Sequence, residues 1–308
     1  MSVFQPLLAA ALFLALTGAA GAAGGPLAPA QPAPFFALRD VSAVLEASQK
    51  PDSRWWEPAR LRMLLGSAAE GAGLVLHDFG PDPRHPEFAF LAADLGASGP
   101  GKTRPRRSAV FLKGSDALPA TLVNVELIPA NPGGTASACW AATGLGARTG
   151  GLGGVVETTA GRLAATGVAF LHQYGHVRPI SPRPAPGAAL LCWDEPAGEA
   201  RLLAAVAFTG PRAAAPAFEP VSEIDLAGIR AGSWVVLFQT GASSARSAVF
   251  FDARGEGPLR YLITGLAPGV WQIWRNGFLT IPDAVVRPHT GTLYFEAPAG
   301  NYFLRALE

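Results

Sequence analysis

The sequence predicts an all-β protein, a multi-stranded antiparallel β-sandwich with short helices only near the N-terminus. From residue 74 onward, apolar and polar side chains alternate with a period of two in many short segments. The 36 Gly and 28 Pro residues fall mostly between these segments, as short strands joined by tight turns require. No segment of helix length separates the strands, which argues against the crossovers that parallel strands need.

The N-terminal segment resembles a secretory signal. The first 38 residues contain no charged side chain, and an apolar run, Leu7 to Leu16, is followed by the small residues at 20–23. This run is about half as long as the ~20 residues that span a bilayer. We therefore expect a signal peptide over residues 1–23, no transmembrane segment, and a periplasmic or secreted protein. The Ala/Pro/Gly-rich residues 24–34 are expected to form a flexible leader.

Two short helices are expected before the first strand. Asp40 is a candidate N-cap for one of them, and Pro58 occupies a favoured first-turn position of the other. Their apolar positions follow helical spacing: Val41, Val44 and Leu45 in the first, and Leu61, Leu64, Leu65 and Ala68 in the second.

The strands are expected to form two successive parts, residues 35–212 and 219–308, divided near the Ala-rich residues 213–218. Residues 121–127 show the alternation of a half-buried antiparallel strand. Asn276-Gly277 predicts a two-residue hairpin, because both positions of such a turn need φ > 0. Further strands are expected at residues 247–252, 260–264, 292–297 and 302–307.

The two cysteines, Cys139 and Cys192, are each followed by tryptophan. In an oxidising compartment they are expected to form a disulfide that closes a loop of about fifty residues. Two free thiols on neighbouring strands are the alternative. A metal site would need ligands from elsewhere in the chain, so no metal and no cofactor are predicted.

The charges nearly balance, with 24 Lys and Arg against 23 Asp and Glu. No global field attracts nucleic acid or an anionic membrane, so nucleic acid is not an expected partner. A local basic cluster is a candidate site for sulfates or carboxylates, although a solvated loop would have the same composition. Its members are Lys102, Arg104, Arg106, Arg107 and Lys113.

The same loop contains a P-loop pattern, GASGPGKT, at residues 96–103. A functional P-loop needs a helix directly after the pattern. Pro105 and the strand-like residues 108–112 follow instead, so nucleotide hydrolysis is not expected.

The segment VAFLHQYGHVRP holds the candidate catalytic residues. If it is extended, His172, Tyr174 and His176 share one face, with Arg178 next in line. β-Elimination at a uronate needs a base for the C5 proton and a group that neutralises the carboxylate. These residues offer both, although a polar strand end has the same pattern. Two histidines are also half of a zinc site, for which His289 would have to supply a third ligand.

Aromatic residues are the second ligand signal. Trp271 and Trp274 have opposite parity in one strand, so at most one faces the core if the strand is regular. The other is a candidate stacking platform for a sugar ring, with Gln272 beside it. Large aromatics in a sandwich are usually core residues, and Trp55, Trp56 and Trp234 are open to the same two interpretations.

Residues 227–305 contain three characteristic stretches, AGIRAGSWVVLF, PLRYLITGLAPGVWQIWRNG and GTLYFEAPAGNYFLR. Together they resemble the C-terminal β-sandwich of heparinase II/III-like polysaccharide lyases, in which a Gly-Leu-x-Pro-Gly-x-Trp turn precedes an Asn-Gly or Asp-Gly hairpin. Upstream, Asp94 and Arg107 match positions of a hairpin in that sandwich. The resemblance implies an acidic polysaccharide as the ligand.

The resemblance also implies a division of labour. In that family the active cleft lies between an α/α toroid and the sheet domain, and the toroid supplies most catalytic residues. The segment between the predicted signal and the first strand is too short for a toroid. We therefore expect an exported protein that binds or helps process an acidic polysaccharide, without catalysis by this chain alone, with a separate toroid subunit as a possible partner. The alternative is a polysaccharide lyase that acts through Tyr174, His172, His176 and Arg178.

Overall fold

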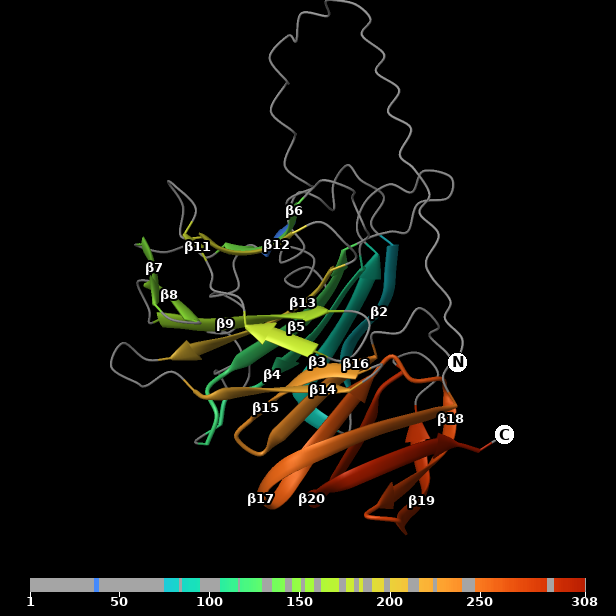
Figure 1. Ribbon diagram of the computed structural model, residues 1–308. Helices are drawn as coiled ribbons and strands as arrows, with labels where there is room; N and C mark the ends of the chain where they lie inside the picture. Colours follow the sequence, from blue (N-terminus) through green and yellow to red (C-terminus); the bar gives the residue numbers. More distant parts are fainter. Residues whose placement is uncertain are drawn as a thin grey trace, which may run out of the picture. The chain divides into compact units, whose positions relative to one another are not determined.

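The computed structural model consists of strands arranged in three sheets (Figure 1). Every secondary-structure element among its described residues is a strand, which confirms the all-β prediction, and the two expected N-terminal helices lie outside those residues. The structure describes residues 36–38, 75–82, 85–94, 106–115, 117–128, 135–141, 146–150, 153–157, 162–171, 176–179, 183–184, 190–196, 200–209, 216–223, 226–239, 247–286 and 291–307.

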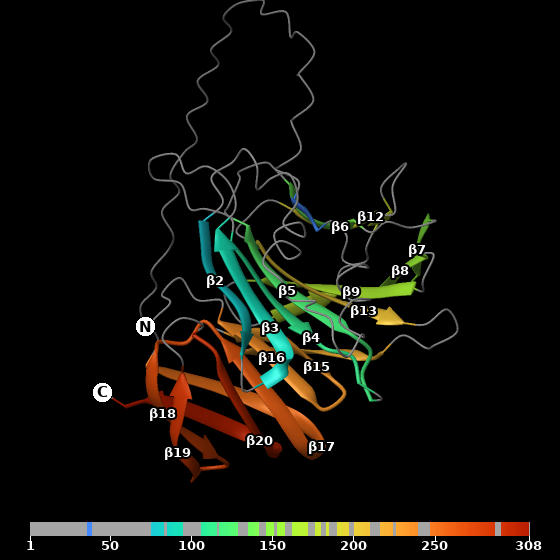
Figure 2. The same ribbon diagram turned by 180° about the vertical axis from the view of Figure 1, so that it is seen from behind.

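The largest sheet has nine strands, and all its neighbouring strands are antiparallel. Figure 2 shows β2 to β5 side by side along one half of it. Along the sheet the order is β2 (Val75–Asp82), β3 (His85–Asp94), β4 (Arg106–Leu112), β5 (Thr121–Ile128), β13 (Ala200–Thr209), β9 (Arg162–Leu171), β8 (Gly153–Glu157) and β7 (Gly146–Gly150), with β10 (His176–Pro179) also paired to β9.

A smaller sheet brings the two cysteine positions together. Its register places Cys139 directly opposite Cys192 on antiparallel strands. Opposed residues of such a pair have Cα atoms about 4.5–5.5 Å apart, within the range that a disulfide bridges. The disulfide itself stays a prediction. The four strands are β1 (Phe36–Leu38), β6 (Thr135–Ala141), β12 (Leu190–Pro196) and β11 (Arg183–Pro184).

The last part of the chain builds a seven-stranded sheet. The expected hairpin is present between β18 (Gly269–Arg275) and β19 (Phe278–Val286). Its turn residues Asn276 and Gly277 have φ of 50° and 83°, as a type I′ turn requires. The order is β14 (Phe218–Glu223), β15 (Leu226–Ala231), β16 (Trp234–Gln239), β17 (Ala248–Thr264), β20 (Leu293–Ala306), β18 (Gly269–Arg275) and β19 (Phe278–Val286).

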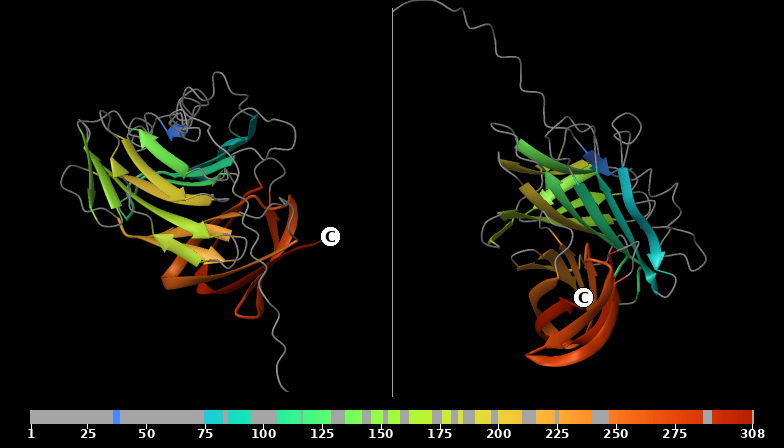
Figure 3. Two further views of the ribbon diagram at one scale, coloured as in Figure 1. Left: turned by 45° about the horizontal axis from the view of Figure 1, so that its top comes forward. Right: turned by 90° about the vertical axis from the view of Figure 1, so that its right-hand side faces the viewer.

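Two strands of this sheet are long and bent. The sequence predicts four short strands where the structure has two, because the 247–252 and 260–264 segments are both parts of β17, and the 292–297 and 302–307 segments both contribute to β20. The pairing of β17 with β20 continues on both sides of a register shift between Ala253 and Pro258. Gly255 and Gly257 lie in this shift at positive φ, so the chain bends without leaving the sheet. The right-hand view of Figure 3 shows these orange and red strands curling.

The bend explains one wrong expectation. Parallel pairs were not expected, but β16 pairs in parallel with residues 260–264 of β17. Such a pair needs a crossover connection. Here the first half of β17 is itself part of that crossover, so no helix is required. The described part of the chain contains a second parallel pair, β1 with β6.

One hydrophobic core lies between the nine-stranded and the seven-stranded sheets. Thr121, Leu122 and Val123 are all fully buried. The prediction that this strand is half-buried is therefore wrong at its start, because β5 is an interior strand with both faces covered. The core side chains come from β3, β4, β5 and β13 on one side, and from β15, β16 and β17 on the other.

A second core lies inside the folded seven-stranded sheet. It joins Val235 and Leu237 of β16 to Phe251 of β17 and Leu304 of β20. Trp271 is fully buried in it, and its indole Nε1 donates a hydrogen bond to the Ala267 carbonyl at 2.9 Å. The bent sheet thus encloses apolar side chains between its own two halves.

Two tyrosines hold the bend of β20. The hydroxyls of Tyr261 and Tyr302 both donate to the carbonyl of Pro298, the former at 3.2 Å. Burial, followed by the hydrogen bond with Tyr302, raises the pKa of Tyr261 far above its usual value. Burial also raises the pKa of Tyr302. Both hydroxyls therefore keep their protons in the folded protein at pH values where the unfolded chain loses them.

We expect the free energy of unfolding to fall as the pH rises above about 10, the ordinary tyrosine pKa. Tyr261→Phe should cost about 1 kcal/mol at pH 8, through the lost hydrogen bond, and should flatten this decline because one titrating group is gone. Urea unfolding from pH 8 to 11 measures both effects. Equal slopes for parent and variant would contradict the assignment.

Replacing the tryptophans of β18 should separate its two faces. Trp271→Ala leaves a cavity in the enclosed core and should cost about 3–5 kcal/mol. Trp274→Ala, on the opposite face of the same strand, should cost less than about 1.5 kcal/mol. Denaturant unfolding compares them directly, and equal losses of stability would show that the two side chains are not on opposite faces.

Candidate functional site

Two of the four residues predicted for catalysis, His176 and Arg178, lie on strand β10. Strand β9 ends at Leu171 and β10 begins at His176, and these two residues are opposite each other in an antiparallel pair. The two strands therefore run in opposite directions. His172 and Tyr174 lie outside the described residues, while Arg178 lies on β10. The catalytic role of these residues stays a prediction.

The predicted basic cluster is only partly described. Lys102 and Arg104 lie outside the described residues, whereas Arg106 and Arg107 begin β4. The backbone register places Arg106 opposite Asp94 of β3. Because a strand begins three residues after Thr103, no P-loop helix follows the GKT pattern.

The structure separates the two tryptophans of β18. Trp271 belongs to the enclosed core and is 0% exposed, so it has no surface to offer a ligand, and its prediction as a binding residue is corrected. Trp234 is a core residue too. Trp274 and Gln272 lie on the opposite face of β18 and are only partly buried, so both stay candidates. Trp55 and Trp56 lie outside the described residues.

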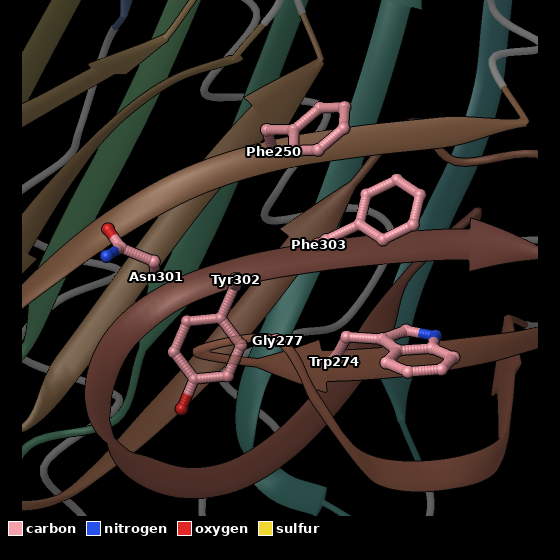
Figure 4. A pocket seen from close by; sticks show the side chains of 6 residues that line it. All are labelled: Phe250, Trp274, Gly277, Asn301, Tyr302 and Phe303. Carbon is pink, nitrogen blue, oxygen red and sulfur yellow. The ribbon is translucent and has the colours of Figure 1, made fainter.

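Trp274 contributes to a hollow of about 400 Å³ on the outer face of the seven-stranded sheet. This volume is at the lower end of the range for small-ligand sites. We call the site the outer hollow, and Figure 4 shows its side chains. It is lined by Phe250, Trp274, Gly277, Asn301, Tyr302 and Phe303.

Three aromatic residues of the hollow form a row across the strands, the outer aromatic row. Phe250 of β17 is opposite Phe303 of β20, which is opposite Trp274 of β18. The rings of Phe250 and Phe303 are stacked, with centroids 4.5 Å apart and an interplanar angle of 22°. Phe250 is nevertheless 63% exposed. A sheet face that presents a large apolar surface to solvent is a recognised mark of a binding site.

Polar side chains flank the row on both sides. Two residues further along β20, Arg305 is exposed and opposite Gln272 of β18. On the other flank, Asn301 is opposite Asp252 of β17. The Asp252 carboxylate pairs with Arg254, with 3.4 Å between Oδ2 and Nε. An apolar strip with hydrogen-bonding groups on both edges is suited to a ligand that has apolar faces and polar edges.

The sequence analysis did not select Phe250, Phe303 or Arg305. The alternation that would have found them is present, since Phe250 has the opposite parity to the core residues Val249 and Phe251. Phe303 and Arg305 likewise alternate with Leu304 on β20. That these residues are neighbours depends on the register of three strands, which is not readable from the local pattern.

A second group of polar and aromatic side chains lies where the two large sheets meet, and we call it the seam cluster. His85 of β3 packs against Tyr294 of β20 with ring centroids 4.0 Å apart, and its Nδ1 lies 3.5 Å from Glu87 Oε1. The Tyr294 hydroxyl donates to Glu296. Arg260 Nε lies 3.7 Å from Glu296 Oε1, and the guanidinium carbon of Arg260 lies 5.5 Å from the centre of the Trp234 ring.

Tyr294 is the strongly perturbed residue of the seam cluster. Burial, followed by the hydrogen bond to Glu296, raises its pKa well above the usual tyrosine value. The hydroxyl therefore keeps its proton at neutral pH, where it is a hydrogen-bond donor and a poor base. His85 is partly exposed and lies beside Glu87.

Two further features, a metal-binding group and a membrane-spanning helix, are absent from the described residues. No group of three or more His, Cys, Asp or Glu side chains there has an arrangement that would hold a metal ion. Nor does that part of the chain contain a helix with the length and apolar character of a membrane span.

A comparison with known protein families finds a match within the seven-stranded sheet. Residues 221–306 match the family model of the heparinase II C-terminal domain. These residues span most of the seven-stranded sheet, including the outer hollow and Tyr294. No curated protein matches the chain. The match confirms the resemblance seen in the sequence, because residues 221–306 are similar to the C-terminal domain of heparinase II.

Proposed function

We propose that this protein is exported and binds an acidic polysaccharide at the outer hollow, without catalysis by this chain alone. The observation that carries the proposal is the outer aromatic row, Phe250, Phe303 and Trp274, exposed on a sheet that matches a heparinase II C-terminal domain. Sugar rings have apolar faces that stack on aromatic side chains and hydroxyls that bond to polar groups at the edges. The charge-free N-terminal residues support export.

The lining of the hollow favours binding over catalysis. Of its six residues, only Tyr302 has a titratable side chain. Its hydroxyl is already bonded to the Pro298 carbonyl, and its pKa is raised, so it is a poor base at neutral pH. A ligand in the hollow would thus meet stacking surfaces and amide groups but no acid–base pair. In this proposal any cleavage of the glycan is done by another chain, such as the separate toroid subunit expected from the resemblance.

Trp274→Ala should weaken binding to an acidic polysaccharide by about 10- to 100-fold, because a large stacking surface is lost. Affinity electrophoresis or calorimetry with a panel of uronate and sulfated polysaccharides measures the effect. Phe278→Ala is the matched control, since Phe278 is 77% exposed on the same sheet but does not line the hollow. Failure of the parent to bind any polymer of the panel, or equal effects of the two variants, would overturn the proposal.

A second candidate function, polysaccharide lyase activity, is favoured by the seam cluster. His85, with Glu87 at Nδ1, could take the C5 proton of a uronate on its other ring nitrogen. The electron pair would form the C4–C5 double bond as the C4–O bond breaks, and the leaving oxygen would take the Tyr294 proton. Arg260 is the candidate partner for the uronate carboxylate. The alternative centre, Tyr174 with His172, His176 and Arg178, lies partly outside the described residues.

Ultraviolet absorbance distinguishes these possibilities, because β-elimination creates a conjugated product. For the non-catalytic proposal we expect a flat trace with every uronate polymer. A rise abolished by His85→Gln and by Tyr294→Phe would assign a lyase to the seam cluster, whereas a rise abolished only by Tyr174→Phe would assign it to the segment selected from the sequence. Circular dichroism of each variant checks that the fold is intact.

A further inference from the structure

We infer that the glycan lies across the strands, along the outer aromatic row, and that Arg305 alone binds its acidic group. The inference rests on the proposed function and adds the direction of the chain and the residue that selects acidic over neutral sugars. Three observations carry it: the register of the row, the uneven charges on its two flanks, and the exposure of Arg305.

The register gives the direction. Phe250, Phe303 and Trp274 are opposite one another on β17, β20 and β18, so the row runs perpendicular to the strands. Two steps between neighbouring strands cover about 10 Å, which is close to the length of a disaccharide unit. Leu279 of β19, which is opposite Trp274 and also exposed, extends the row by one strand. A chain laid along the strands would leave the aromatic surface after one ring.

The flanks differ in charge. On the Asp252 flank, Arg254 is paired with the carboxylate, so that edge has no net charge. On the opposite flank, Arg305 has neither an ion pair nor a side-chain hydrogen bond with the described residues. A guanidinium that is exposed and unpaired can bind a carboxylate or sulfate by donating two parallel hydrogen bonds to it. The acidic edge of the glycan is therefore expected on the Arg305 side.

The position of the acid along the row follows from Asp283. Strand β19 has a bulge opposite Gln272, where Pro282 and Asp283 lie between the paired residues Ile281 and Ala284. Asp283 is exposed there, two strands away from Arg305. A second acidic group over β19 would meet a like charge, whereas one over β20 meets Arg305. The sugar ring that carries the acid is thus expected beside Phe303, with Gln272 bonding to the next ring.

Arg305→Gln tests the inference, with the double variant Asp252→Asn, Arg254→Gln as the control on the other flank. The probes are one uronate polysaccharide and its carboxyl-reduced, neutral derivative, each titrated at low and high salt by calorimetry. We expect Arg305→Gln to weaken binding of the acidic polymer about 10-fold and to reduce its salt dependence. Binding of the neutral derivative should not change, and the double variant Asp252→Asn with Arg254→Gln, which leaves that flank without net charge, should keep both affinities within about twofold.

The outcomes separate this inference from the proposed function. If Trp274→Ala weakens binding but Arg305→Gln behaves like the Asp252→Asn, Arg254→Gln control, the hollow binds glycans and the role of Arg305 is wrong. Equal losses for the acidic and neutral polymers in Arg305→Gln would also overturn it, because the residue would then not select charge. If neither Trp274→Ala nor Arg305→Gln changes the affinity, the proposed function itself fails. Phe250→Ala adds a test of direction, since it should weaken binding of polymers but not of a disaccharide that reaches only Phe303 and Trp274.

Discussion

The bend in β17 and β20 is the constraint on which the rest of the C-terminal sheet depends. Both strands pair with each other on either side of the bend, so the sheet folds over and encloses a core between its own halves. Gly255 and Gly257 permit the turn of the backbone, and the carbonyl of Pro298 is held by two tyrosine hydroxyls. A buried hydroxyl that lacks a hydrogen-bond partner costs free energy. The two hydrogen bonds to the Pro298 carbonyl therefore also stabilise the bend.

The folded sheet has an inner and an outer layer, which differ in how many of their faces are buried. The inner layer, which includes β16, is buried on both faces, since Val235 and Leu237 enter the enclosed core and Val236 and Phe238 enter the core between the two sheets. The outer layer, β18 with the first half of β17 and the second half of β20, has only one buried face. Its other face is free to carry Phe250, Phe303 and Trp274, and the candidate binding surface is therefore a consequence of the bend.

The seam cluster illustrates how titratable and aromatic side chains from distant segments come together where two sheets meet. His85 and Tyr294 are separated by more than two hundred positions in the sequence, yet their rings are 4.0 Å apart. The apolar neighbours Phe88 and Trp234 surround the pair and partly exclude water from the tyrosine hydroxyl. Desolvation of this kind raises the pKa of a neutral acid, which accounts for the raised pKa of Tyr294 at the junction.

The sequence by itself determined the all-β class, the Asn276-Gly277 hairpin and the resemblance of the C-terminal part to heparinase II/III-like proteins, because period-two alternation, turn chemistry and short motifs are local properties. It also predicted that at most one of the two tryptophans of β18 faces the core. Only the tertiary structure decided which one is exposed, joined four expected strands into two bent ones, and placed Phe250, Phe303 and Arg305 beside Trp274. Those outcomes depend on register and on which face is covered, and both are set by contacts between segments far apart in the chain.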